Sequence, residues 1–236
     1  MHGVQVLDKV KKSESPSGLT VGQTESFPHL GACQSGDRVL QNCTDKTISP
    51  RSLVHEPLHE PLPNKKYQVI YADPPWSYKD KASAGKRGAS FKYPTMNLTD
   101  IKALPVANIA DDNCILFLWI TMPKLNEVME VIESWGFTYK TCAFTWVKRN
   151  KIKPTWFMGM GRWTRANAEL CLLATKGKPK RISASVLSVV DDPIEKHSKK
   201  PNTVREKIVE LCGDLPRIEL FARQRVDGWD CWGNEV

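Results

Sequence analysis

From about residue 65 onward, short runs of apolar residues alternate with stretches in which apolar residues recur every three or four positions. The runs predict buried strands and the periodic stretches predict amphipathic helices. Strands are expected at 67–72, 114–120, 137–147, 168–174 and 217–222, with a short extended segment at 186–190. Helices are expected at 123–135 and 202–212, with a helical turn at 99–104. This alternation predicts an α/β fold with a mostly parallel, doubly wound sheet.

Residues 1–64 differ in composition: they are rich in Ser, Thr, Gly and Pro, and their apolar residues show no sustained periodicity. Such a segment predicts a flexible, poorly ordered N-terminal tail ahead of one domain at 65–236. The tail contains a repeated His-Glu-Pro-Leu sequence at 55–62. Because Pro57 prevents the helix that would align its two histidines, no metal site is expected there.

The first predicted strand, 67–72, stops at Asp73-Pro74-Pro75-Trp76. Prolines cannot continue a sheet ladder, so the chain must leave the sheet at the carboxyl end of this strand. Ligands of open α/β sheets bind at that edge. The motif supplies a carboxylate, a rigid turn with free carbonyls and a flat aromatic surface. An exocyclic amine could donate to Asp73 and to the Pro74 carbonyl while Trp76 stacks on its ring.

The Asp-Pro-Pro-Trp motif resembles the signature of amino-group methyltransferases that act on nucleobases. In this form it resembles the N6-adenine methyltransferase family typified by the catalytic subunit of the eukaryotic mRNA adenine methyltransferase, which also has bacterial and phage DNA-methylating members. The resemblance covers about residues 65–236 and implies a Rossmann-like fold that transfers a methyl group from S-adenosyl-L-methionine to the N6 amine of adenine. It implies catalytic roles for Asp73, Pro74, Pro75 and Trp76.

The resemblance also implies a cofactor site built from both ends of the domain. Its residues would be Ala72, Asp73, Lys200, Phe221, Arg223, Arg225, Asn234 and Glu235. Lys200, in a Lys-Lys-Pro element, would bind the cofactor carboxylate, while Asn234 and Glu235 would hold the ribose hydroxyls. An amide and a carboxylate suit a diol, which both donates and accepts hydrogen bonds.

The motif order is permuted, because the catalytic motif comes first in the chain and the cofactor strand comes last. This order resembles the β-class arrangement of DNA amino-methyltransferases. The glycine-rich cofactor loop of many methyltransferases is absent, since Ala222 and Arg223 stand where glycine is expected.

Charge favours a polyanionic partner. The chain has 34 basic and 26 acidic residues, and residues 65–236 hold 28 and 19 of these. No acidic residue occurs between 134 and 168, where basic and aromatic residues mix. The expected nucleic-acid contacts are Trp76, Tyr93, Lys148, Arg149, Lys151, Arg162, Trp163 and Arg165, with Tyr93 as a wall of the base pocket. Basic groups neutralise phosphates and aromatic rings stack on unpaired bases, although a solvated cationic loop with core tryptophans remains an alternative.

Further features bound the class of protein. The lysine- and glycine-containing segment 79–93 predicts either a lid over the site or a surface loop. The seven cysteines show no zinc spacing, and neither a signal peptide nor an apolar run of membrane length is evident. A reducing, cytoplasmic location is therefore expected, in a bacterial host cell if the protein is phage-encoded. A homodimer or an accessory subunit is compatible with the sequence.

Three functions remain open. Methylation of adenine in DNA is favoured by the compact single domain without a recognisable RNA-binding module. Methylation of adenine in RNA would use the same catalytic residues. A non-catalytic nucleic-acid-binding subunit is disfavoured because the Asp-Pro-Pro-Trp motif is intact.

Overall fold

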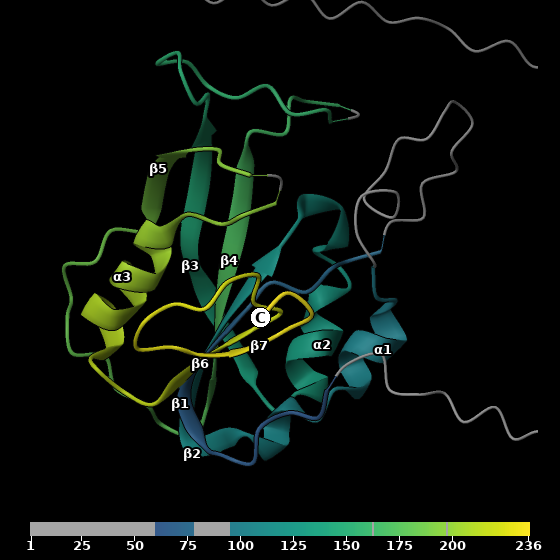
Figure 1. Cartoon of the computed structure of the whole chain (residues 1–236), viewed down its shortest axis with the longest axis vertical. Helices are drawn as coiled ribbons and strands as arrows, with labels where there is room; N and C mark the ends of the chain where they lie inside the picture. Colours follow the sequence, from purple (N-terminus) through teal and green to yellow (C-terminus); the bar gives the residue numbers. More distant parts are fainter. Residues whose placement is uncertain (1–59, 78–94, 162, 197) are drawn as a thin grey trace, which may run out of the picture. The chain divides into compact units, whose positions relative to one another are not determined.

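A seven-stranded sheet with the strand order β5-β3-β4-β2-β1-β6-β7 organises the residues that the computed structural model describes (Figure 1). These residues are 60–77, 95–161, 163–196 and 198–236. The strands are β1 (Tyr67–Ala72), β2 (Ala110–Ile120), β3 (Thr138–Arg149), β4 (Ala168–Lys176), β5 (Val189–Pro193), β6 (Arg217–Leu220) and β7 (Asp230–Trp232). The α-helices are α1 (Leu98–Ala103), α2 (Val128–Ser134) and α3 (Asn202–Cys212), and short 3₁₀ helices occur at Val106–Asn108 and Met122–Lys124.

Strand direction determines which loops lie at the edge of the sheet where β1 ends and Asp73 follows. β1 pairs in parallel with β2 and β6, and β6 pairs in parallel with β7. β4 runs antiparallel to both β2 and β3, whereas β3 and β5 are parallel. The predicted mostly parallel sheet is therefore present, except that β4 runs antiparallel to its neighbours and forms a hairpin with β3. The end of β3 and the start of β4 consequently lie at the same edge of the sheet as the end of β1.

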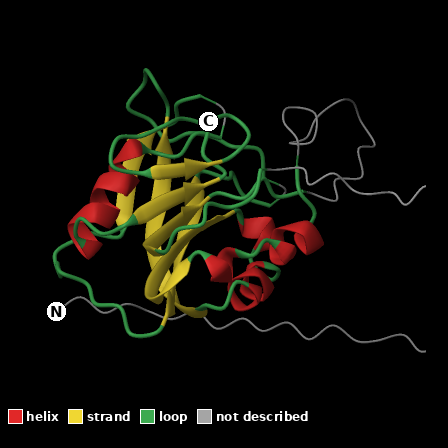
Figure 2. Ribbon diagram, turned by 60° about the horizontal axis from the view of Figure 1, so that its bottom comes forward, coloured by secondary structure: helices red, strands yellow, loops and turns green. Residues whose placement is uncertain are grey.

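Helices cover both faces of the sheet, with α3 on one side and α1 and α2 on the other (Figure 2). The alternation of side chains along a strand explains this double burial. Ile70 and Ala72 pack in the core under α1 and α2, while Val69 and Tyr71 pack in the core under α3. A strand buried on both faces must be apolar throughout, as 67–72 is.

The main differences from the expected elements have local causes. The helix expected at 123–135 starts instead as the 3₁₀ helix Met122–Lys124, with a proline in its first turn, and only Val128–Ser134 is α-helical. Leu125, expected on the buried face, is 42% exposed. β7 was not predicted, since three residues carry too little periodicity to be recognised.

The packed chain begins before the expected domain boundary at residue 65. The Trp232 indole donates to the backbone carbonyl of Glu60 at 2.8 Å, and Leu62 packs against the core. Residues 1–59 of the predicted tail and the whole of the predicted lid, 79–93, lie outside the described residues. Within the described ranges, no helix is long and apolar enough to cross a bilayer.

A buried ion pair fixes α3 to β6. The Arg205 guanidinium donates two hydrogen bonds to the Glu219 carboxylate, both of 2.7 Å, and a third of 3.0 Å to Asn202 Oδ1. Its guanidinium also lies over the Tyr71 ring at 5.6 Å. Bidentate pairing satisfies both buried charges, so this contact holds the segment before α3 in a defined place beside the sheet.

Candidate active site

Asp73 follows directly after β1, at the carboxyl edge of the sheet. Its Oδ2 accepts a hydrogen bond of 2.6 Å from Lys200 Nζ. The Lys200 side chain is only 9% exposed and the Asp73 side chain 26%, so the carboxylate keeps some access to solvent while the ammonium is enclosed. Lys200 comes from the segment just before α3, 127 residues away in sequence. The fold therefore brings together Asp73 of the Asp-Pro-Pro-Trp motif and Lys200 of the Lys-Lys-Pro element.

Glu169, at the start of β4, is part of this cluster and was not predicted from the sequence. Its Oε2 lies 3.4 Å from Lys200 Nζ, and its Oε1 accepts a 2.5 Å hydrogen bond from Lys148 Nζ. Asp73, Lys200, Glu169 and Lys148 thus form a chain of alternating charges. A carboxylate that opens an apolar strand, directly after a long stretch without acids, was the available sequence signal.

The two carboxylates of the cluster have different proton affinities. Burial raises the pKa of Asp73 above its ordinary value, and the Lys200 ammonium opposes this only in part. Burial also disfavours the Glu169 carboxylate, but Lys200 and Lys148 outweigh that effect and hold the pKa of Glu169 below its usual range. Burial likewise works against the Lys200 charge, yet Asp73 and Glu169 together raise the pKa of Lys200. Asp73 is therefore the better proton acceptor of the two.

The Asp-Pro-Pro-Trp turn differs from expectation in two respects. Trp76, expected to offer a stacking surface, is only 4% exposed, and its indole donates to the carbonyl of Trp119 at 3.2 Å. The ring packs in the core because the turn folds back over the α1 and α2 side of the sheet. The proline carbonyls are also engaged, Pro74 O by the Trp76 amide at 2.8 Å and Pro75 O by the Met96 amide at 2.8 Å. A carbonyl has two lone pairs, so Pro74 O retains capacity for one more donor.

The segment after β6, where the sequence predicts cofactor contacts, is held together by close packing between two turns. Phe221 has φ of +62°, an uncommon left-handed conformation for a residue other than glycine, and its ring packs edge-on against Trp232 at 5.5 Å. The Ala222 amide donates to the carbonyl of Trp232 at 2.9 Å. A Cβ on Gly233 would lie 2.5 Å from Ala222 O, so only glycine fits there.

This packing places the end of the chain beside the turn that follows β6. The Arg223 Nε lies 3.5 Å from Glu235 Oε1, and both side chains are partly exposed. Asn234 is exposed next to Glu235. Arg225 lies elsewhere, in the lining of a cavity of about 700 Å³ between α3 and the loop 224–229. The expected cofactor residues after β6 therefore divide into two groups.

The expected nucleic-acid contacts fall into residues that are paired within the protein and residues that are exposed. Lys148 is enclosed in the ion-pair cluster, and Arg149 donates bidentately to Asp191 at 2.5 Å while it lies over the Trp156 ring at 4.3 Å. The two basic groups closest to the sheet are thus neutralised within the protein. The exposed members of the set are Lys151, Trp163 and Arg165. Tyr93 and Arg162 lie outside the described residues.

Similarity to known proteins identifies the family. A family model described as MT-A70 matches residues 67–235, which is most of the chain. The chain belongs to the MT-A70 family. The family and the Rossmann-like methyltransferase fold predicted from the sequence are confirmed.

Relatives include both bacterial and eukaryotic proteins. The Type II methyltransferase M.MunI of a Mycoplasma species is 40% identical over 193 residues, a match that covers 74% of this chain and 80% of that protein. The human N(6)-adenosine-methyltransferase catalytic subunit METTL3 is 27% identical over 175 residues, covering 72% of this chain but 28% of that protein. The human N(6)-adenine-specific methyltransferase METTL4 is 28% identical over 192 residues, covering 75% and 39%. The chain thus spans most of the Mycoplasma protein and less than half of either human protein.

Proposed function

We propose that the protein transfers a methyl group from S-adenosyl-L-methionine to the exocyclic N6 amine of adenine in DNA. The observation that carries this proposal is the Asp73 carboxylate at the end of β1, held by Lys200 and partly open to solvent, in an MT-A70 domain. Similarity over most of the length of a Type II methyltransferase supports DNA as the substrate.

The residues around Asp73 fit the chemistry of the proposed cofactor, which would supply a methyl group bound to a cationic sulfur. Asp73 and Glu169 provide negative charge at the sheet edge, and Asn234 and Glu235 provide an amide and a carboxylate that suit a ribose diol. Lys200 was expected to bind the cofactor carboxylate. Its ammonium already lies between Asp73 and Glu169, so we assign it instead to the orientation of Asp73.

The amine of adenine is a weak nucleophile because its lone pair is delocalised into the ring. Hydrogen bonds from the amine to Asp73 and to the remaining lone pair of Pro74 O would favour pyramidalisation and direct the lone pair at the methyl group. Catalysis then rests on positioning and electrostatics, without a covalent enzyme intermediate. The raised pKa of Asp73 suits it to take the proton that the amine loses.

Methylation of RNA is the second candidate, since the human catalytic subunit named for adenosine matches the same part of the chain. The lower identity, 27% against 40%, and the small share of that protein that is matched make it the weaker candidate. A non-catalytic subunit would not need the Asp73–Lys200–Glu169 arrangement.

The test is transfer of radiolabelled methyl groups to duplex DNA, single-stranded DNA, duplex RNA and single-stranded RNA. We expect label in DNA adenine with the wild type and none with Asp73→Asn, while Asp112→Asn, a change at an exposed carboxylate, behaves like the wild type. Label in RNA alone would show that the protein methylates RNA, the second candidate function. Equal activity of Asp73→Asn and the wild type would refute the proposed site.

A further inference from the structure

The loop of the β3–β4 hairpin, residues 150–167, exposes large apolar side chains. We call this segment the hairpin tip. Ile152 is 95% exposed, Met158 71%, Met160 83% and Trp163 99%. Trp156, at 49%, is the fifth exposed apolar residue of this loop. Single exposed apolar residues are common on protein surfaces, but five in one loop are typical of a contact surface.

The backbone of the hairpin tip is closely folded around two glycines. A Cβ on Gly159 would lie 2.0 Å from the carbonyl oxygen of Ala166, and a Cβ on Gly161 would lie 2.1 Å from that of Thr164. The Ala166 amide donates to Gly159 O at 3.2 Å. Trp163 is thus carried outward on a tight turn between these contacts.

The positive charge of the hairpin tip indicates a negatively charged partner. Lys151, Lys153 and Arg165 are exposed within it, and no acidic residue occurs between 134 and 168. Cationic groups interspersed with exposed aromatic and thioether side chains fit phosphates and base faces. A second copy of the same cationic tip would be repelled.

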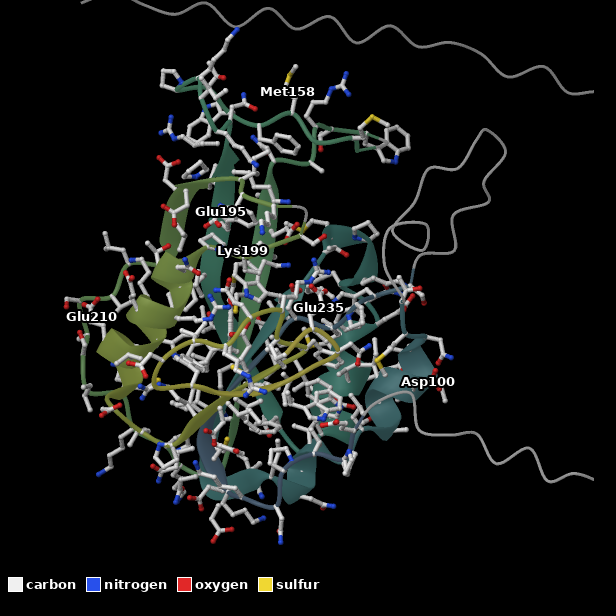
Figure 3. The ribbon with its side chains drawn as sticks, in the orientation of Figure 1. Asp100, Met158, Glu195, Lys199, Glu210 and Glu235 are labelled. Atoms are coloured by element: carbon white, nitrogen blue, oxygen red, sulfur yellow. The ribbon has the colours of Figure 1, made fainter. Side chains whose placement is uncertain are left out.

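The position of the hairpin tip connects it to the proposed catalytic edge. Lys148 and Glu169, which belong to the Asp73 cluster, form the base of the same hairpin. Figure 3 shows Met158 at the outer end of this loop, beyond the sheet and beyond Glu195 and Lys199. Nucleic acid with an adenine at Asp73 would therefore pass the hairpin tip.

We propose that the hairpin tip contacts duplex DNA next to the target adenine, where Trp163 stacks into the base step that opens when the adenine leaves the helix. This inference rests on the proposed function and specifies its substrate as a duplex from which the base is extruded. Extrusion breaks pairing and stacking, and a fully exposed indole supplies a replacement stacking partner.

The test compares Trp163→Ala, Trp163→Phe and the control Leu187→Ala, which changes an exposed apolar side chain outside the tip. The substrates are unmethylated amplified duplex DNA and duplexes in which the methylated adenine, once mapped, is placed in a mismatch. On paired duplex we expect kcat/KM of Trp163→Ala to fall about 10-fold or more, with Trp163→Phe close to the wild type. On mismatched duplex we expect kcat/KM of Trp163→Ala to lie within about 3-fold of the wild type, because the target base is already unpaired.

Salt dependence separates stacking from charge. Trp163→Ala leaves the slope of log Kd against log salt unchanged, whereas replacement of both Lys151 and Lys153 by Gln reduces it by roughly 0.9 for each phosphate that the protein no longer neutralises. Melting temperatures should not differ, since Trp163 contributes nothing to the core.

Three results would overturn the inference. These are equal activity of Trp163→Ala and the wild type on paired duplex, an equal deficit on paired and mismatched duplex, or a wild-type dimer that Trp163→Ala dissociates. Absence of label with the wild type would instead count against the proposed function. In that case fluorescence anisotropy with the unmethylated amplified duplex decides the inference, and unchanged affinity in Trp163→Ala overturns it.

Discussion

Replacement of Glu169 by glutamine tests whether the charge chain behind Asp73 works as a unit. The change preserves the size of the side chain and removes one negative charge. Lys148, with a side chain 15% exposed, then loses its pair with Glu169, and Lys200, with a side chain 9% exposed, keeps Asp73 as its carboxylate partner within the cluster. The structure thus predicts a loss of both stability and activity from one isosteric substitution.

The size of the stability loss in Glu169→Gln follows from the burial of the cluster. Removal of one member of a buried ion pair costs about 3–5 kcal/mol. The Glu169 side chain is 17% exposed and glutamine can still accept one hydrogen bond, so we expect about 2–3 kcal/mol. For a domain of this size, 1 kcal/mol corresponds to about 2–4 °C, which predicts a fall of the melting temperature by roughly 4–12 °C.

The pH dependence of this loss has a defined sign. The pKa of Glu169 is lowered in the folded protein, so its stabilising contribution is complete above the ordinary value of 4.5. It is lost as the pH falls from there through the folded-state pKa. The difference in melting temperature between wild type and Glu169→Gln should therefore be full at pH 7 and shrink below about pH 4.5.

Activity provides the second readout. Without Glu169, Lys200 binds Asp73 alone and competes with the adenine amine for that carboxylate, so we expect kcat to fall about 10- to 100-fold. The control is Glu195→Gln, which removes a more exposed carboxylate from its pair with Lys199 and should change stability by less than about 1 kcal/mol. If Glu169→Gln matched Glu195→Gln in both melting temperature and kcat, the cluster would have no functional role.

Three further predictions concern the same edge of the sheet. The logarithm of kcat/KM falls with decreasing pH as Asp73 is protonated, with a midpoint above the ordinary carboxyl value of 3.8; a pH profile that is flat through the acid range would contradict this. Gly233→Ala drives a Cβ toward Ala222 O and weakens cofactor binding at least about 10-fold by calorimetry, with a lower melting temperature; wild-type affinity would show that the two turns move independently. Trp76→Phe loses the hydrogen bond to Trp119 O and lowers the free energy of unfolding by about 1–3 kcal/mol in urea, whereas an unchanged value would mean that the indole is not structurally required.

The strand before Asp73 and the helix that follows Lys200 could be predicted from local sequence. The strand that precedes Asp73 is apolar throughout and ends at two prolines, so its position followed from hydrophobic pattern and backbone chemistry alone. The helix 202–212 was predicted with its observed bounds, because its apolar period ends at Gly213, which has φ of +92°. Both elements carry their start or stop signal within a few residues.

The contacts that depend on strand pairing were not predictable. Glu169 faces Trp146 across the antiparallel ladder and reaches Lys148 and Lys200 only because β4 reverses direction. Nothing in the local sequence indicates that a carboxylate opening an apolar strand will meet two lysines from other segments. The direction of the Trp76 indole is similarly a tertiary property, since a tryptophan after two prolines is chemically suited to the surface and to the core.

The base and the tip of the β3–β4 hairpin have different roles in the proposed site. Its base is fixed by the Lys148–Glu169 pair, which in turn holds Lys200 against Asp73. Its tip carries exposed residues that make few contacts with the core. Because the base is held by buried charges and the tip is not, the sequence of 150–167 can change what the enzyme contacts while the geometry at Asp73 is preserved. Exchange of this segment for that of a relative is therefore expected to change the DNA contacts of the protein and leave its methyl-transfer chemistry in place.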